Sequence, residues 1–142
     1  MGRNFHGSPP ISEERIIMNG FAAIKYSPTT YPSSASTMIK GDYRLWTSHY
    51  QASPKSCRYA WNAMVCRNYL PDDAEMKHFF WALYFLKNYS SEIIAARALS
   101  TTSKTLRKWV RIMVHALKNL SFDVVSHIWM VQCILRSLQI VF

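Results

Sequence analysis

The sequence predicts an all-α protein, a small bundle of four to five helices that contains a helix-turn-helix. Apolar residues recur at helical spacing in several segments, and no segment shows the alternation typical of a strand. Residues that favour helix N-caps, Ser53, Ser91 and Thr102, stand directly before three of these segments. We expect the bundle over residues 41–120, a flexible leader over 1–40, and an apolar C-terminal segment, helical in character, over 121–142.

The leader shows no apolar pattern that would form a core. Pro28 and Pro32 stand among Ser, Thr and Tyr residues, which predicts a flexible segment over 27–37. The stretch 13–24 is expected to form a helical turn or two.

A short helix is expected over 42–50, and a second helix begins at Ser53-Pro54. Ser53 is the N-cap, and a proline at the first helical position loses no hydrogen bond. The second helix ends before Pro71, and its apolar face consists of Cys57, Ala60, Trp61, Met64 and Val65.

The third expected helix is opened by Pro71-Asp72-Asp73, whose carboxylates suit the positive end of a helix, and is closed by Lys87-Asn88. It is apolar nearly all round, which predicts a position at the centre of the fold. The residues responsible are Met76, Phe79, Phe80, Trp81, Leu83, Tyr84, Phe85 and Leu86.

Two further helices are joined by a short turn at 100–102. Ser91 caps the first, over 92–99, and Thr102 caps the second, which runs from 103 to about 119. At about 100° per residue, one side of the second helix is apolar and the opposite side is basic. The apolar side consists of Leu106, Trp109, Val110, Met113, Leu117 and Leu120, and the basic side of Lys104, Lys108, Arg111, His115 and Lys118, flanked by Arg107.

This basic stripe predicts a polyanionic partner, because no Asp or Glu occurs between Ile93 and Phe122. A helix-turn-helix fixes one face of its second helix to the domain and presents the other to duplex DNA. We expect Ser103, Lys104, Arg107 and Lys108 nearest the bases, and phosphate contacts from Arg97, Arg111 and Lys118. The alternatives are an ordinary solvated basic face and an amphipathic helix on a membrane surface.

Composition agrees with an intracellular basic protein. The chain has 142 residues and a net charge of +9, which favours nucleic acid or an anionic surface as partner. The three cysteines and five histidines are scattered, so we expect no metal site and no cofactor. The start of the chain lacks the apolar run of a signal peptide. The apolar segment 124–142 contains Arg136 and several polar residues, so we expect it to pack on the bundle or on a partner rather than to span a membrane.

Residues 46–125 resemble the N-terminal helical region of PIF/Harbinger-type DDE transposases. The resemblance is carried by Ser53-Pro54 and Trp61, by Lys77-His78-Phe79-Phe80-Trp81-Ala82-Leu83-Tyr84-Phe85-Leu86-Lys87, and by Lys104-Thr105-Leu106-Arg107-Lys108-Trp109-Val110. It implies a helix-turn-helix that engages transposon DNA, with Lys104, Thr105, Arg107 and Lys108 at its DNA-facing start and Trp109 in the core.

The chain also departs from that family. The family's catalytic domain begins soon after this region with a metal-binding Asp in a D-G-T-like motif, and no such motif occurs here. Asp123 is the only acid after Glu92, whereas two-metal chemistry needs several clustered carboxylates. Residues 126–138 resemble an insertion. We therefore expect no catalytic residue and no small-molecule substrate, as in a transposase-derived chain cut short before its catalytic domain.

The sequence thus predicts a nuclear DNA-binding module without enzymatic activity. The alternatives are a protein-interaction module that self-associates or binds a partner through 124–142, and a transposase remnant without function.

Overall fold

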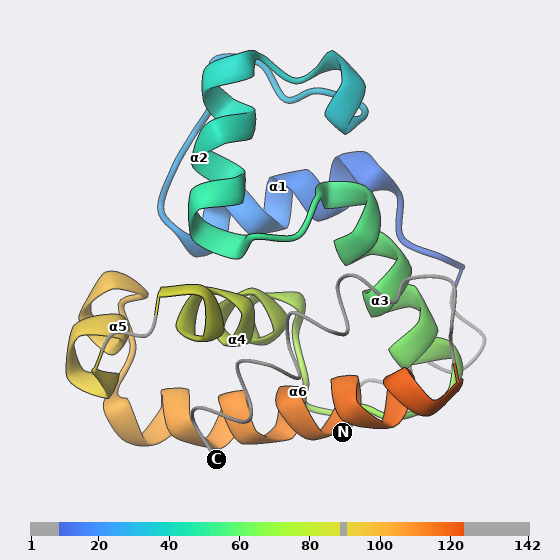
Figure 1. Cartoon of the computed structure of the whole chain (residues 1–142), viewed down its shortest axis with the longest axis vertical. Helices are drawn as coiled ribbons and strands as arrows, with labels where there is room; N and C mark the ends of the chain where they lie inside the picture. The colour runs from blue at the N-terminus through green and yellow to red at the C-terminus, as the bar shows by residue number, and fades with distance from the viewer. Residues whose placement is uncertain (1–8, 89–90, 124–142) are drawn as a thin grey trace.

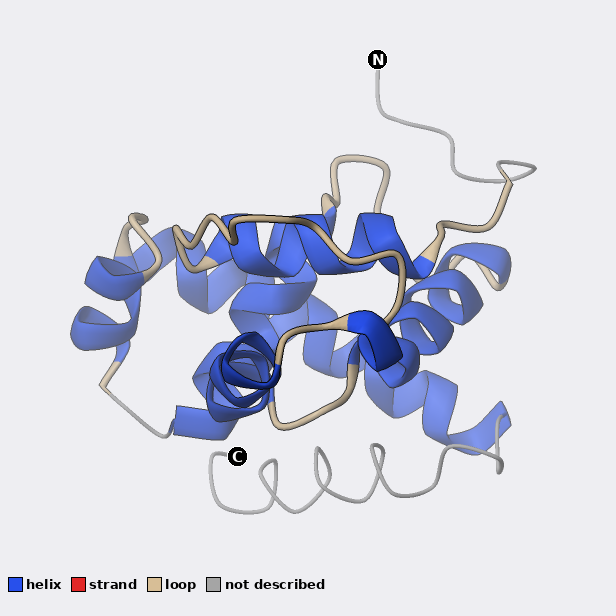
Figure 2. Cartoon of the chain, turned by 90° about the horizontal axis from the view of Figure 1, so that it is seen from above, coloured by secondary structure: helices blue, strands red, loops and turns tan. Residues whose placement is uncertain are grey.

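The computed structural model describes residues 9–88 and 91–123, and these residues form helices and loops without a strand (Figure 2). The helices are α1 (Glu13–Ala23), α2 (Lys40–Tyr50), α3 (Pro54–Cys66), α4 (Met76–Asn88), α5 (Glu92–Ala98) and α6 (Ser103–Asp123), with a short 3-10 helix at Ala35–Thr37. The all-α prediction is confirmed. The five helices expected between residues 41 and 120 are α2 to α6, and α1 is additional. The expectations for residues 1–8 and 124–142 lie outside the described residues.

The expectation that residues 1–40 lack a core is wrong for the segment around α1. Ser12 caps this helix by accepting from the Arg15 amide, and α1 packs against α3 and α4. Ile16, Ile17 and Phe21 are completely buried. After the helix, the Tyr26 hydroxyl donates to the Asp42 carboxylate of α2 at 2.5 Å. Residues 13–26 are therefore part of the bundle rather than a leader.

The packing of α1 on α2 depends on Gly20. A Cβ atom at this position would lie 2.2 Å from Cη2 and 2.3 Å from Cζ3 of Trp46. Trp46 is itself fully buried, and its ring meets those of Phe21 and Phe80 edge-on, with centroids 5.4 Å away in both cases. The absent side chain at Gly20 thus lets the indole lie directly against the α1 backbone.

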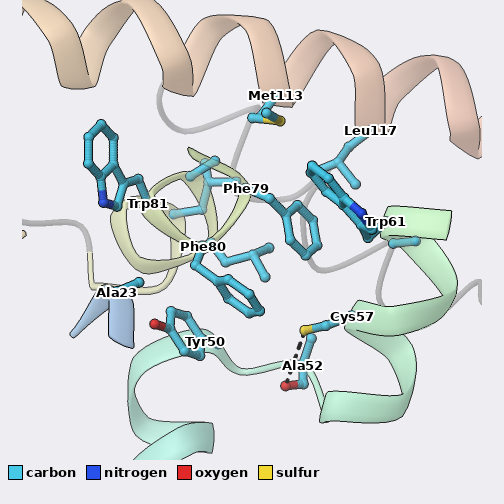
Figure 3. Close-up of a cluster of buried hydrophobic side chains, with 14 of the residues drawn as sticks. Ala23, Tyr50, Ala52, Cys57, Trp61, Phe79, Phe80, Trp81, Met113 and Leu117 are labelled. Carbon is cyan, nitrogen blue, oxygen red and sulfur yellow. Dashed lines mark hydrogen bonds between the residues drawn. The ribbon is translucent and has the colours of Figure 1, made fainter. Parts of the chain in front are cut away.

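α4 lies between α6 on one side and α1 and α2 on the other (Figure 1). This position explains why its sequence is apolar nearly all round, and it confirms the prediction that the helix is central. Figure 3 shows Phe79 directed toward Trp61 of α3 and Phe80 toward Tyr50 of α2. Met113 and Leu117 reach the same cluster from α6 (Figure 3).

The predicted start of α3 is confirmed. Ser53 accepts from the Ser56 amide at 3.2 Å, and Pro54 occupies the first turn. Cys57 is completely buried, and its thiol donates to the Ala52 carbonyl at 3.9 Å (Figure 3). Burial raises the pKa of this thiol well above its ordinary value, because the thiolate would lose its hydration.

The expected start of α4 is wrong by about one turn. Pro71, Asp72 and Asp73 form a turn, in which the Ala74 amide donates to the Pro71 carbonyl at 3.0 Å, and the helix begins at Met76. The His78 side chain caps the start of this helix, because its Nδ1 accepts a hydrogen bond from the Glu75 amide at 3.0 Å. Asp72 and Asp73 precede the helix rather than occupy its first turn.

Candidate nucleic-acid interface

α5 and the turn that follows are fixed by local hydrogen bonds at both ends. Ser91 accepts from the Ile94 amide at 3.3 Å and so caps α5, as predicted. At the other end, Ser100 has a left-handed backbone, with φ of 57°. The Thr101 amide donates to the Ala96 carbonyl at 2.9 Å and the Ser100 amide to the Arg97 carbonyl at 3.2 Å. These bonds form a Schellman motif without glycine, which ends the helix and reverses the chain.

α6 then begins at Ser103, directly after its cap. The Thr102 hydroxyl accepts from the Thr105 amide at 3.2 Å, which confirms the predicted N-cap. The helix has 21 residues and is therefore roughly 30 Å long. It lies along one edge of the molecule, with α3, α4 and α5 on the same side of it (Figure 1).

The division of α6 into an apolar and a basic face is confirmed. The six residues of the predicted apolar face are each 5 % exposed or less: Leu106, Trp109, Val110, Met113, Leu117 and Leu120. The opposite face carries the exposed residues Lys104, Arg107, Lys108, Arg111, His115 and Lys118. Ser103 and Thr105 are half-buried at the helix start, and Arg97 is exposed on α5. All eight residues predicted to contact DNA therefore lie at the surface.

The absence of acids from this stretch of the sequence does not leave every cation without an acidic partner, because Arg107 has one in the fold. Its Nε donates to Oε1 and Oε2 of Glu92 at 3.1 and 3.0 Å, and its Nη2 donates to Oε2 at 2.6 Å. The hydrogen bond from Arg107 lowers the pKa of the Glu92 carboxyl below its ordinary value. The acid-free run starts one residue after Glu92, and the fold brings this acid back against α6.

Lys108 also has an acidic neighbour from outside the helix. Its Nζ lies 3.9 Å from the Asp73 carboxylate and 4.9 Å from the centroid of the Trp109 ring. Lys108 is therefore directed toward the turn before α4. By contrast, within residues 9–88 and 91–123 no carboxylate lies within ion-pair distance of Lys104 or Arg97.

Behind this face, His78 joins α4 to α6. Its imidazole stacks on the indole of Trp109, with ring centroids 3.7 Å apart and planes inclined by 3°. Burial lowers the pKa of His78 to about 4, so the ring is neutral near pH 7 and its Nδ1 remains available as an acceptor. Trp109 is thus held in the core, as the transposase resemblance implied.

Sequence reasoning missed the roles of Glu92, Asp73 and His78. Glu92 and Arg107 are 15 residues apart and on different helices, so helix periodicity does not connect them. No pattern within either helix signals this pair, because it depends on how α5 and α6 meet in the fold.

The described residues contain no helix that is both long and apolar enough to cross a membrane. No protein-family model, curated protein or solved structure matches the chain. The resemblance to PIF/Harbinger-type transposases therefore rests only on the residues quoted for it and stays a prediction.

Proposed function

We propose that α5, the turn and α6 form a helix-turn-helix module that binds duplex DNA and has no catalytic activity of its own. The observation that carries the proposal is the two-sided character of α6, whose apolar face is held in the core while its basic face is exposed. The resemblance to the helical region of PIF/Harbinger-type transposases supports a transposase-derived origin. DNA binding in turn favours a nuclear location.

The start of α6 is suited to contact with nucleic acid. Its first turn contains no acidic residue, and Lys104 there is exposed. The N-terminus of a helix carries a partial positive charge and unpaired amides, both of which favour a phosphate. An anion at this end of α6 would therefore meet Lys104 and the helix terminus together.

The basic face of α6 is longer than the major groove is wide, so its two ends are expected to contact different parts of the DNA. Lys118 lies 14 residues beyond Lys104, which corresponds to about 21 Å along the helix axis. The major groove is only about 12 Å wide. If the first turns of α6 enter the groove, Lys118 lies beyond it and contacts the DNA backbone. Arg97, in the last turn of α5, is a proposed phosphate contact from the neighbouring helix.

The ion pairs lower the expected number of phosphate contacts. Arg107 is engaged by Glu92 and Lys108 is directed toward Asp73, which leaves at least three cations for the DNA backbone: Arg97, Lys104 and Arg111. Each neutralised phosphate contributes about −0.9 to the slope of log affinity against log salt. We expect a slope of about −2.7 or steeper.

The test is fluorescence anisotropy of the full chain with a labelled duplex, titrated at several salt concentrations. The full chain is needed because α1 is part of the core. Lys104→Glu/Arg111→Glu reverses two charges on the basic face. The matched control, Lys40→Glu/Arg44→Glu, makes the same change at exposed positions of α2, on the opposite side of the bundle from α6 (Figure 1).

We expect the Lys104→Glu/Arg111→Glu variant to lose at least about tenfold in affinity, because two phosphate contacts are lost. The slope of log affinity against log salt should also be less steep. The α2 variant should change affinity much less. Equal losses in the two variants would indicate attraction to net charge rather than to α6. Absence of binding at about 50 mM salt, where phosphate contacts are strongest, would refute DNA binding and favour a remnant without this function.

A second candidate function is a protein–protein interface. Ile93 and Ile94 are each 59 % exposed on α5, directly after Glu92. Adjacent exposed isoleucines are the kind of surface that protein partners cover. Light scattering over a range of concentrations tests whether the chain self-associates and whether Ile93→Ser/Ile94→Ser abolishes it. The interface predicted over 124–142 lies outside the described residues.

A further inference from the structure

We propose that Glu92 is a positioning residue, which holds Arg107 so that its free edge reads a guanine in the major groove. This inference rests on the proposed DNA-binding function and assigns a specificity-determining pair within it. It rests on the geometry of the two side chains and on the charge that Glu92 brings to a basic surface.

The geometry leaves one edge of the guanidinium available. Glu92 is the first residue of α5, and Arg107 is in the second turn of α6. The carboxylate accepts from Nε and Nη2, so it occupies the side edge of the planar group. The end edge, formed by Nη1 and the second hydrogen of Nη2, has no acceptor among these contacts. The Arg107 side chain is 49 % exposed, so it lies at the surface.

That free edge matches a guanine. Guanine presents two acceptors, O6 and N7, in the major groove, and an arginine that binds both is the commonest specific contact. The guanidinium supplies parallel N–H donors in a rigid plane, which lysine does not. Because Glu92 fixes the plane of Arg107 before DNA binds, less side-chain freedom is lost on binding.

Stability alone gives little reason for this pair. The Glu92 side chain is 37 % exposed and that of Arg107 49 %, and exposed ion pairs contribute little to folding. A carboxylate on this face also repels the phosphates that the neighbouring lysines would attract. If Glu92 orients Arg107 toward a base, the gain in base recognition offsets this repulsion.

The experiment starts from duplexes selected by the wild-type full chain out of a randomised library. Each selected guanine is then replaced in turn, G·C by A·T, and anisotropy competition gives the discrimination at each position. The variants are Arg107→Lys, which keeps the charge but not the fork, and Glu92→Ala. Asp73→Ala is the matched control, because it removes an acid that pairs with Lys108, at 3.9 Å, and not with Arg107.

We expect the wild type to prefer G·C at one position by tenfold or more, which lies within the range for a bidentate contact. Arg107→Lys and Glu92→Ala should reduce this preference to threefold or less at that position only. Glu92→Ala and Asp73→Ala should both bind unselected DNA at least as tightly as the wild type, since each removes a negative charge.

Retention of the full preference in Glu92→Ala would overturn the positioning role. So would a loss of affinity that is uniform over all positions and accompanied by lower helicity in circular dichroism, since that result indicates a structural role. If the wild type binds DNA but enriches no sequence, the inference fails while the proposed function stands. If the wild type binds no duplex, both fail.

Discussion

Replacement of Gly20 by alanine tests whether α1 belongs to the core. In an open helix this change stabilises, because alanine has the higher helix propensity by about 1 kcal/mol. At Gly20, however, the new methyl group would lie 2.2 Å from Cη2 of Trp46, whereas carbon atoms in contact are normally about 3.5–4.0 Å apart. The indole would have to move by more than about 1 Å.

The surroundings of Trp46 oppose such a movement. The ring is fully buried, packs edge-on against Phe21 and Phe80, and its Nε1 donates to the Ala52 carbonyl at 2.8 Å. The Tyr50 hydroxyl also donates to the Gly20 carbonyl, so the α1 backbone is held in place. Overpacking of this kind costs about 1–3 kcal/mol, and a lost buried hydrogen bond about 1 kcal/mol more. Against the gain in propensity, we expect Gly20→Ala to lower the free energy of unfolding by about 2 kcal/mol.

The assay is urea unfolding of the full chain followed by circular dichroism, with Gly41→Ala as the matched control. Gly41 is exposed in the first turn of α2, and no atom lies within 4 Å of a Cβ built there. The control should therefore gain up to about 0.5–1 kcal/mol, so the same substitution has opposite signs at the two sites. A neutral or stabilising Gly20→Ala would refute the close packing of α1 on Trp46.

Two further predictions concern the ends of helices. The folded chain holds His78 with a pKa of about 4, against about 6.5 when unfolded, so protons bind preferentially to the unfolded state in this range. Its contribution to stability should be complete above about pH 6.5 and decline as the pH falls to about 4, by up to about 3 kcal/mol. His78→Gln, which keeps an acceptor for the Glu75 amide, should lose this dependence in urea titrations at several pH values, and an unchanged dependence would contradict the assignment. Ser100→Gly should raise the free energy of unfolding by about 0.5–1 kcal/mol, because only glycine adopts a φ of 57° without strain, and a lower urea midpoint would contradict the left-handed turn.

Much of the helical architecture follows from local patterns. Ser53, Ser91 and Thr102 all cap the helices expected of them, and all six residues that the helical wheel places on the apolar face of α6 are buried. These features depend on neighbours within one or two turns, which the sequence displays directly. The central place of α4 was also predictable, since a helix without a polar face must be covered on all sides.

The errors over α1 and the start of α4 have different causes, one a contact between distant segments and the other an unusual local cap. α1 has 11 residues and includes a glycine, so its own pattern is weak, and its stability comes from Trp46, 26 positions after Gly20. The start of α4 depends on the side chain of His78, which is not a usual capping residue.

In the candidate site, too, local features were predictable from the sequence and contacts between helices were not. Exposure of the basic residues on α6 was predictable from periodicity, whereas the pairing of Arg107 with Glu92 was not, because it depends on how α5 and α6 meet. A run without acids in the sequence therefore does not guarantee cations without acidic partners. Among the predicted DNA-contacting cations, Lys104, Arg97 and Arg111 have no carboxylate within ion-pair distance in the described chain, a smaller set than the sequence indicated.

The basic face of α6 nevertheless supports the proposal of a polyanionic partner, because the fold gains little from this face. Lys104 and Lys108, and likewise Arg107 and Arg111, are like charges four residues apart, an arrangement that destabilises a helix by about 0.2–0.5 kcal/mol per pair. Acids between them would remove this repulsion at no cost to the buried face, yet the two acids that approach, Glu92 and Asp73, come from outside the helix. An exposed surface that opposes its own helix, and whose arginine is oriented by an acid from the neighbouring helix, is more consistent with recognition of a polyanion than with an inert solvated face.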